Sequence, residues 1–188
     1  MNISLETLHA DTRDRFILSK GHACPALYMV LQEKGILNKK DLEGFAVDGG
    51  ILQQHPDRDL SRGIEFSTGS LGHGLSVAAG MALRSRTRKK DYRVFCLMGD
   101  GEMNEGSVWE AFIFAAQYKL SKLVAIVDHN KMQALGHGKD IFDLEPISEK
   151  GRAFGWHVQE ADGHDFDDIA EAFDALSEEK PNLIVLHT

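Results

Sequence analysis

The sequence predicts an α/β fold in which helices flank both faces of a central parallel sheet. Two apolar runs, Arg93 to Met98 and Leu123 to Val127, have the composition of strands that are buried on both faces. Helical patterns alternate with these runs, and such alternation makes right-handed βαβ units. The 188 residues suffice for one domain with a core and are too few for two ordinary domains. We therefore expect a single domain over residues 1–188.

The segment before the first of these strands predicts two helices. Pro25 to Glu33 carries apolar residues at helical spacing, and Gly35 is placed to end this helix. Asn38 can cap a second helix over Lys39 to Phe45.

A long irregular segment and a buried helix follow. Residues Gly49 to Gly74 are rich in Gly, Ser and Asp, which favours a loop, and a loop of this length in a compact domain is usually functional. Gly74 to Leu83 consists of small and apolar residues, the composition of a helix that is pressed against a sheet.

The helix after the first strand has the clearest pattern in the chain. Val108, Phe112 and Ala116 lie on one stripe, and Asn104 or Glu105 can serve its N-terminus. After the second strand we expect a polar loop, a helix near Pro146 to Phe154, a strand around Trp156 to Glu160, a helix from Asp167 to Leu176 and a last strand from Leu183 to Leu186.

Charge and composition exclude several classes of function. The chain has 21 Lys and Arg against 29 Asp and Glu, a formal net charge of −8, which repels nucleic acid and anionic membranes. The densest basic cluster is expected to be the solvated end of a helix and consists of Arg84, Arg86, Arg88, Lys89 and Lys90. No stretch approaches the length of a membrane span and the N-terminus is polar, so we expect a cytoplasmic protein. Cys24 and Cys96 lie far apart, which excludes a disulfide framework, and Cys96 sits in an apolar run as a buried thiol.

Two polar loops that each follow an apolar strand are the candidates for chemistry. Ligands of open parallel sheets bind beyond the carboxyl ends of strands, and here those ends carry Gly99-Asp100-Gly101 and Asp128-His129-Asn130. Glycines let backbone N–H groups approach an anion, whereas a carboxylate would repel a phosphate unless a cation lay between them. A lone Gly-Asp-Gly is a common turn. The two loops together predict a metal-diphosphate site, with Mg²⁺ or Ca²⁺ held by Asp100 and Asn130.

Two of the nine histidines stand out by their neighbours. His22 follows Gly21 and His55 precedes Pro56, in loops that are expected to reach the strand ends. An imidazole there can donate to a phosphate or a sugar hydroxyl and exchange protons near neutral pH.

The pattern formed by the two loops resembles the signature of thiamin diphosphate enzymes, Gly-Asp-Gly followed after one helix and one strand by Asn. Here it reads GDGEMNEGSVWEAFIFAAQYKLSKLVAIVDHN. Two further stretches resemble the transketolase family, DRFILSKGHACPALY from Asp14 to Tyr28 and FSTGSLGHGLSVAAGMA from Phe66 to Ala82, and QQHPDR fits the loop between them. The resemblance covers nearly the entire chain and implies a thiamin diphosphate-binding fold.

The resemblance implies a role for each matching residue. The metal ligands would be Asp100, Asn130 and the backbone carbonyl of Met132; the cofactor would be bound by His22, Gly69, Ser70, Leu71, Gly101 and Asn130; and the catalytic set would be His55, His22 and Glu105. Within these sets His22 and Gly101 would contact the diphosphate, and Glu105 would belong to a subunit contact. His73 and His129 depart from the family pattern, where a glutamine and an acidic residue are usual.

The resemblance also implies a partner. A second domain type binds the pyrimidine ring and supplies the glutamate that activates it, and no such domain fits within 188 residues. The chain therefore resembles the N-terminal subunit of a split transketolase, shortened by the family's first helix and its last segment. It would act with a C-terminal pyrimidine-binding subunit, as a homodimer or heterotetramer, on sugar phosphates of the pentose phosphate pathway.

Two other functions stay open at this point. The chain could belong to a related thiamin diphosphate enzyme, similar to deoxyxylulose phosphate synthase or to the α-subunit of a 2-oxo acid dehydrogenase. It could also be a non-catalytic module for cofactor binding or assembly that keeps the fold and the metal site. Oxygen ligands alone do not choose between Mg²⁺ and Ca²⁺.

Overall fold

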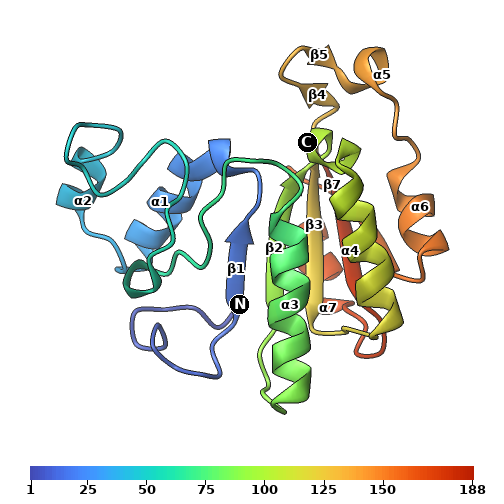
Figure 1. The fold of residues 1–188 in the computed structure, drawn as a ribbon, viewed down its shortest axis with the longest axis horizontal. Helices are drawn as coiled ribbons and strands as arrows, with labels where there is room; N and C mark the ends of the chain where they lie inside the picture. Colours follow the sequence, from blue (N-terminus) through green and yellow to red (C-terminus); the bar gives the residue numbers. More distant parts are fainter.

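The computed structural model describes residues 1–188 and contains a five-stranded parallel sheet in the order β1-β2-β3-β7-β6 (Figure 1). The strands are β1 Arg15–Leu18, β2 Val94–Gly99, β3 Leu123–His129, β6 His157–Asp162 and β7 Asn182–His187. β2 and β3 lie in the middle and are almost wholly buried. The predicted fold class is confirmed, because both faces of the sheet carry helices.

One face of the sheet is covered by three helices, α3 Gly74–Thr87, α4 Gly106–Gln117 and α6 Ile147–Ala153 (Figure 1). They enclose the main core cluster of 22 buried residues, in which the rings of Phe112 and Trp156 stack with centroids 4.3 Å apart. Leu75, Ala78 and Ala82 of α3 are buried against the strands, as the small-residue run predicted. Small side chains let this helix approach the sheet closely.

The opposite face carries α7, Phe166–Asp174, behind the sheet in Figure 1. Its Ala172 joins a separate cluster with Phe95, Val124 and Ile184 from three strands. Asp165 caps α7 by accepting hydrogen bonds from the N–H groups of Asp167 and Asp168, which satisfies donors that the first turn leaves free.

A lobe beside β1 holds the helices that precede α3 (Figure 1). It contains the 3-10 helix η1 Gly21–Ala23, α1 Cys24–Glu33 and α2 Lys39–Glu43, packed around a cluster of seven buried residues. Asn38 caps α2 as predicted, in a capping box with Asp41. The segment from 49 to 73 is mostly irregular, as expected, with one 3-10 turn, η2 Leu60–Arg62.

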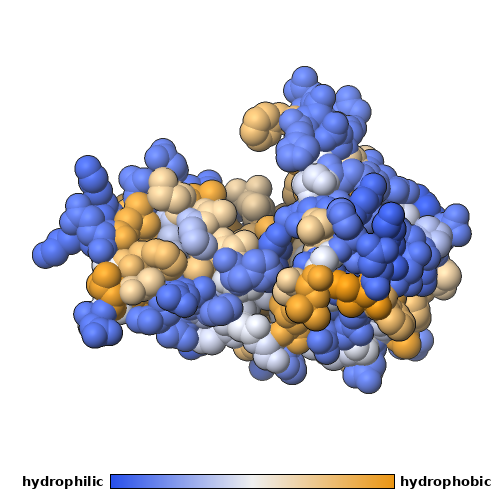
Figure 2. Space-filling view, turned by 90° about the horizontal axis from the view of Figure 1, so that it is seen from above, coloured by the Kyte–Doolittle hydropathy of each residue, from blue (hydrophilic) through white to orange (hydrophobic).

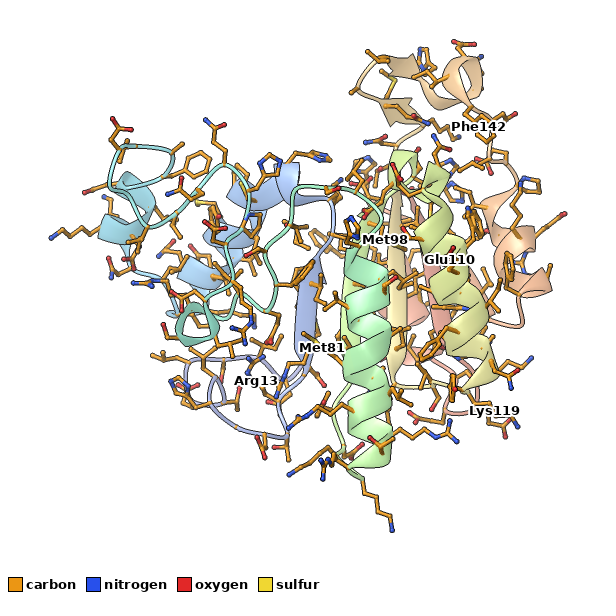
Figure 3. The ribbon with its side chains drawn as sticks, viewed as in Figure 1. Arg13, Met81, Met98, Glu110, Lys119 and Phe142 are labelled. Carbon is orange, nitrogen blue, oxygen red and sulfur yellow. The ribbon has the colours of Figure 1, made fainter.

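Short elements rise above the carboxyl ends of the strands. The hairpin of β4 Met132–Gln133 and β5 Gly136–His137 is followed by α5 Gly138–Ile141, and the 3-10 helix η3 Gly101–Asn104 precedes α4. Met98, near the end of β2, and Phe142, just beyond α5, both lie toward this edge, whereas Lys119 lies at the opposite end of α4 (Figure 3).

The structure corrects the expected elements in three places. β1 was not predicted, and β4, β5 and α5 lie in what was expected to be a polar loop. α3 extends to Thr87, beyond the predicted end at Leu83. Glu105 occupies the N-cap position of α4, in agreement with the prediction that Asn104 or Glu105 serves this N-terminus, although its side chain makes no capping hydrogen bond.

Cysteines and surface charge agree with expectation. Cys24 and Cys96 are both free and buried. Arg86, Arg88 and Lys89 are exposed around the end of α3, so this basic cluster is solvated as predicted. None of the helices has both the length and the apolar character that crossing a bilayer demands.

Candidate functional site

Asp100 lies directly after β2 and is held by backbone groups on three sides. Its own N–H donates to the carbonyl oxygen of Asp128 at 3.1 Å. Its Oδ1 accepts the N–H of Gly101 at 2.7 Å, and its Oδ2 accepts the N–H of Lys131 at 2.7 Å. The carboxylate is therefore fixed in orientation and keeps free lone pairs on both oxygens.

Asn130 lies directly after the neighbouring strand, β3. The parallel register pairs Gly99 with Asp128, so the two loops leave the sheet side by side. The Asn130 Oδ1 accepts the N–H of Met132 at 2.8 Å, which orients the amide, and the residue is exposed. The carboxylate and the amide thus stand at adjacent strand ends, where ligands of parallel sheets bind.

A cavity of about 640 Å³ joins both loops to segments that are distant in the sequence. Six of the predicted site residues line it, namely His22, Leu71, Asp100, Gly101, Asn130 and Met132. They come from η1, the loop before α3, the end of β2 and the segment after β3. One cavity therefore collects the predicted metal ligands and both predicted diphosphate contacts.

His55 and Gly69 lie close to this site without lining the cavity. A Cβ atom on Gly21 would approach the Thr68 Oγ1 to 2.6 Å and the His55 Cδ2 to 3.1 Å, so the chain passes here only because residue 21 is glycine. His55 also lies 3.8 Å from the position of a Cβ on Gly69. The hydroxyl oxygen of Thr68 is buried and has no hydrogen-bond partner.

Glu105 and Ser70 are the other predicted residues that do not line the cavity. Glu105 is exposed at the start of α4, and its Cβ would be 2.6 Å from a Cβ on Gly72. Ser70 is exposed and forms no hydrogen bond. Neither side chain is brought together with Asp100 and Asn130 by this chain alone.

Three polar residues that line the cavity were not predicted from the sequence: Lys20, Glu102 and Gln133. The Gln133 Oε1 accepts a hydrogen bond of 3.2 Å from the Asn104 Nδ2, which joins β4 to η3. A Cβ on Gly101 would lie 3.0 Å from the Cγ of Gln133, so this side chain covers the glycine. Glu102 directly follows the predicted site residue Gly101, and this position was the signal that could have found it. Its burial could not be predicted from its neighbours in sequence.

Lys20 forms a partly buried ion pair with Asp128 beside the cavity. Its Nζ lies 2.5 Å from the Asp128 Oδ2, and the Thr188 hydroxyl donates to Oδ1 at 2.6 Å. Burial by itself would raise the pKa of Asp128, but the hydrogen bonds from Lys20 and Thr188 outweigh it and hold this pKa below its usual range. The positive charge of Lys20 is therefore largely neutralised inside the protein.

His129, which departs from the family pattern, is a buried residue at the end of β3. Its Nε2 lies 2.7 Å from the Glu145 Oε1 and 3.9 Å from the Asp100 Oδ2, and its Nδ1 lies 3.3 Å from the Nδ1 of His187. Its ring therefore lies near Asp100 and connects the segment before α6 to the end of the sheet.

The oxygen donors suit a hard divalent cation. No three His, Cys, Asp or Glu side chains converge on one point. A cation at this edge would rest on one carboxylate, one amide oxygen and backbone carbonyl oxygens, a set that suits Mg²⁺ or Ca²⁺ rather than Zn²⁺. The residues present fit the cation that a bound diphosphate requires.

Comparison with known proteins decides the family. Residues 6–188 match the family described as transketolase, thiamine diphosphate binding domain.

The chain belongs to the transketolase family.

Two curated relatives from this family are named as subunits. An apulose-4-phosphate transketolase subunit from Phocaeicola vulgatus is 43% identical over 178 residues, which cover 94% of this chain and 63% of the relative. A 6-deoxy-6-sulfo-D-fructose transketolase subunit from a Clostridium species is 44% identical over 178 residues, which cover 94% of this chain and 65% of the relative. The chain thus spans less than two thirds of the length of either relative.

Solved transketolases share the whole fold of this chain. The transketolase from Leishmania mexicana superposes with a TM-score of 0.90 at 29% identity, covering 100% of this chain and 30% of the larger one. The Campylobacter jejuni enzyme gives a TM-score of 0.88 at 30% identity, again over 100% of this chain and 30% of the larger one. The sheet and the loops at its carboxyl edge are therefore those of a transketolase thiamine diphosphate-binding domain.

Proposed function

We propose that this chain is the thiamin diphosphate-binding subunit of a transketolase, which transfers a two-carbon ketol unit from a ketose phosphate to an aldose phosphate. The observation that carries the proposal is that Asp100 and Asn130, at the ends of neighbouring strands, line one cavity with His22, Leu71 and Gly101. Membership of the transketolase family supports the same reaction.

Asp100, Asn130 and the carbonyl oxygen of Met132 would hold the divalent cation, and His22 and Gly101 would contact the diphosphate. Asp100 is suited to this role because backbone N–H groups orient its carboxylate and leave lone pairs free on both oxygens. The ion would be Mg²⁺ or Ca²⁺, because both take oxygen ligands of this kind. The cofactor supplies the nucleophilic carbon and the electron sink of the reaction.

The second group of residues would orient the cofactor ring and the sugar. Gly69, Ser70 and Leu71 would hold the aminopyrimidine side of the cofactor, and Leu71 lines the cavity. His55 stands between this turn and Gly21, so an exposed imidazole there can donate to a sugar hydroxyl or accept its proton.

The active protein would contain a separate pyrimidine-binding subunit. Two relatives that resemble this chain are named as subunits, which supports a divided enzyme. Glu105 is exposed at the start of α4, and Ile113 and Phe114 are exposed further along this helix, 56% and 36% respectively. Hydrophobic residues also show on this side in the view from above (Figure 2). We propose that this face meets another subunit, in a homodimer or heterotetramer, in the cytoplasm.

The test is reconstitution with a pyrimidine-binding subunit, thiamin diphosphate and Mg²⁺. We expect transfer from xylulose 5-phosphate to ribose 5-phosphate, and we expect His55→Ala to abolish most of it. Because the relatives are named for apulose 4-phosphate and a sulfofructose, the donor panel should include both sugars. Cofactor binding without turnover of any sugar donor would refute the proposal and favour a binding or assembly module. Turnover of pyruvate as donor would favour a related thiamin diphosphate enzyme.

A further inference from the structure

Glu102 is a buried carboxylate that joins three segments of the chain. It lies in η3, two residues after Asp100, and its side chain is among the largest that are fully buried. One oxygen, Oε1, accepts hydrogen bonds from the Ser19 hydroxyl and from the Gly72 N–H, the latter at 2.8 Å. These donors are 83 and 30 residues away in the sequence.

Each joined segment leads directly into the cavity. Ser19 follows β1 and precedes Lys20 and His22. Gly72 follows Leu71, and Glu102 itself follows Gly101. One carboxylate oxygen therefore sets the positions of the predicted diphosphate, ring and metal loops relative to each other.

Close packing and a third hydrogen bond hold the same junction. The Ser107 hydroxyl donates to the Gly72 carbonyl at 2.8 Å, so both backbone polar groups of this glycine are bound. A Cβ on Gly74 would lie 2.2 Å from the Ser19 Oγ. These contacts hold the segment at Ser19 and the segment from Gly72 to Gly74 against each other.

Both hydrogen bonds of the Glu102 side chain involve one carboxylate oxygen, Oε1. Oε2 is buried and has no hydrogen-bond partner. An unpartnered buried oxygen such as Oε2 is unfavourable for stability. A carboxylate oxygen nevertheless accepts hydrogen bonds more strongly than a neutral oxygen does, and here Oε1 accepts two. Glu102 therefore acts on the junction through Oε1.

We propose that Glu102 is a positioning residue, whose Oε1 locks the Ser19 and Gly72 segments against the Asp100–Gly101 turn and so preorganises the cofactor cavity. This inference rests on the function proposed above. Glu102 aligns the binding loops before thiamin diphosphate binds. This alignment raises the affinity for the cofactor, because the unbound protein already has the bound arrangement.

Glu102→Leu and Glu102→Gln separate this role from general stability. Leucine has no acceptor, so we expect the dissociation constant of thiamin diphosphate in excess Mg²⁺ to rise about tenfold, by calorimetry, and hydrogen exchange of the Gly72 amide to accelerate. Glutamine keeps one acceptor oxygen, so affinity and protection should stay within about threefold of wild type. Glu171→Gln, on the exposed surface of α7, is the matched control.

A second variant decides the question should Glu102→Leu fail to fold. Ser19→Ala removes one donor and leaves the carboxylate, and it should raise the dissociation constant about threefold or more. Wild-type affinity in folded Glu102→Leu, or in Ser19→Ala if the former does not fold, would overturn the inference while the proposed function stands. Equal loss in Glu102→Gln and Glu102→Leu would also overturn it. A wild-type chain that binds no thiamin diphosphate even together with a pyrimidine-binding subunit would refute the proposed function, and this inference with it.

Discussion

The Asp100 carboxylate accepts a hydrogen bond of 2.7 Å from the backbone N–H of Lys131, 31 residues later in the chain. This bond joins the loop after β2 to the loop after β3 at the edge where the two strands end. It orients a carboxylate toward the cavity before any cation arrives, because backbone groups and not flexible side chains hold it. The predicted metal site is thus built on the two central strands of the sheet.

Asp100→Asn should weaken cofactor binding that depends on a divalent cation. Asparagine keeps the size of the side chain and loses the negative charge, which is the only one expected among the metal ligands. We expect the dissociation constant of thiamin diphosphate in Mg²⁺ to rise by about a hundredfold or more, since losing a group that only supports a ligand already costs about 10- to 100-fold. Calorimetry measures this dissociation constant. Asp174→Asn, exposed at the end of α7, is the control, and wild-type affinity in Asp100→Asn would contradict the assignment.

Gly72→Ala should destabilise the fold more than Gly35→Ala. Both glycines have positive φ, +83° and +70°, so alanine strains the backbone at each. A Cβ at Gly35 meets nothing within 4 Å, whereas a Cβ at Gly72 would lie 2.6 Å from the Glu105 Cβ. We expect a loss of about 1 kcal/mol in the free energy of unfolding for Gly35→Ala and about 3 kcal/mol for Gly72→Ala. Equal losses in urea denaturation would show that the contact with Glu105 is not tight.

Cys96 should resist thiol reagents in the native protein. Burial raises the pKa of the Cys96 thiol well above its usual range, and the nearby Glu102 carboxylate raises it further. In the Cys24→Ala variant, we expect maleimide labelling at pH 8 to be slow in buffer and fast in denaturant. Rapid labelling of the folded protein would contradict the burial.

The same thiol should make stability fall in alkali. The folded-state pKa of Cys96 is raised, so the unfolded chain loses this proton first, above about pH 8.5. The contribution of the thiol to stability is therefore complete below that pH and decreases as the pH rises above it. Urea denaturation between pH 7 and 10 should show a shallower decline for Cys96→Ala than for wild type.

Phe112→Ala should cost more stability than any surface change. Its ring is fully buried and stacks on Trp156, and the Phe112 carbonyl accepts the indole N–H at 3.0 Å. We expect the free energy of unfolding to fall by about 3–5 kcal/mol. Phe166→Ala, at a side chain that is 88% exposed, should stay within about 0.5 kcal/mol of wild type. A small loss at Phe112 would mean that the core refills the cavity.

The central strands were predictable because burial on both faces forces an unbroken apolar run, as in Leu123 to Val127. β1, with the sequence RFIL, was missed because it is four residues long, begins with an arginine and lies at the edge of the sheet. The start of α4 was also predictable, because Asn104 or Glu105 was expected at its N-terminus and Glu105 occupies the N-cap position, without a capping hydrogen bond from its side chain.

The alternation of strands and helices, the polar loops that follow two apolar strands and, through the motifs, the family could be inferred from the sequence alone. These features are local: periodicity, turn residues and motif spacing are properties of neighbouring residues. The folded structure was needed to show that His55 lies beside Gly21, that Lys20 pairs with Asp128, and that Ser19 and Gly72 both donate to one oxygen of Glu102. Whether a polar side chain is buried, and which groups it meets there, depends on residues that only folding brings close.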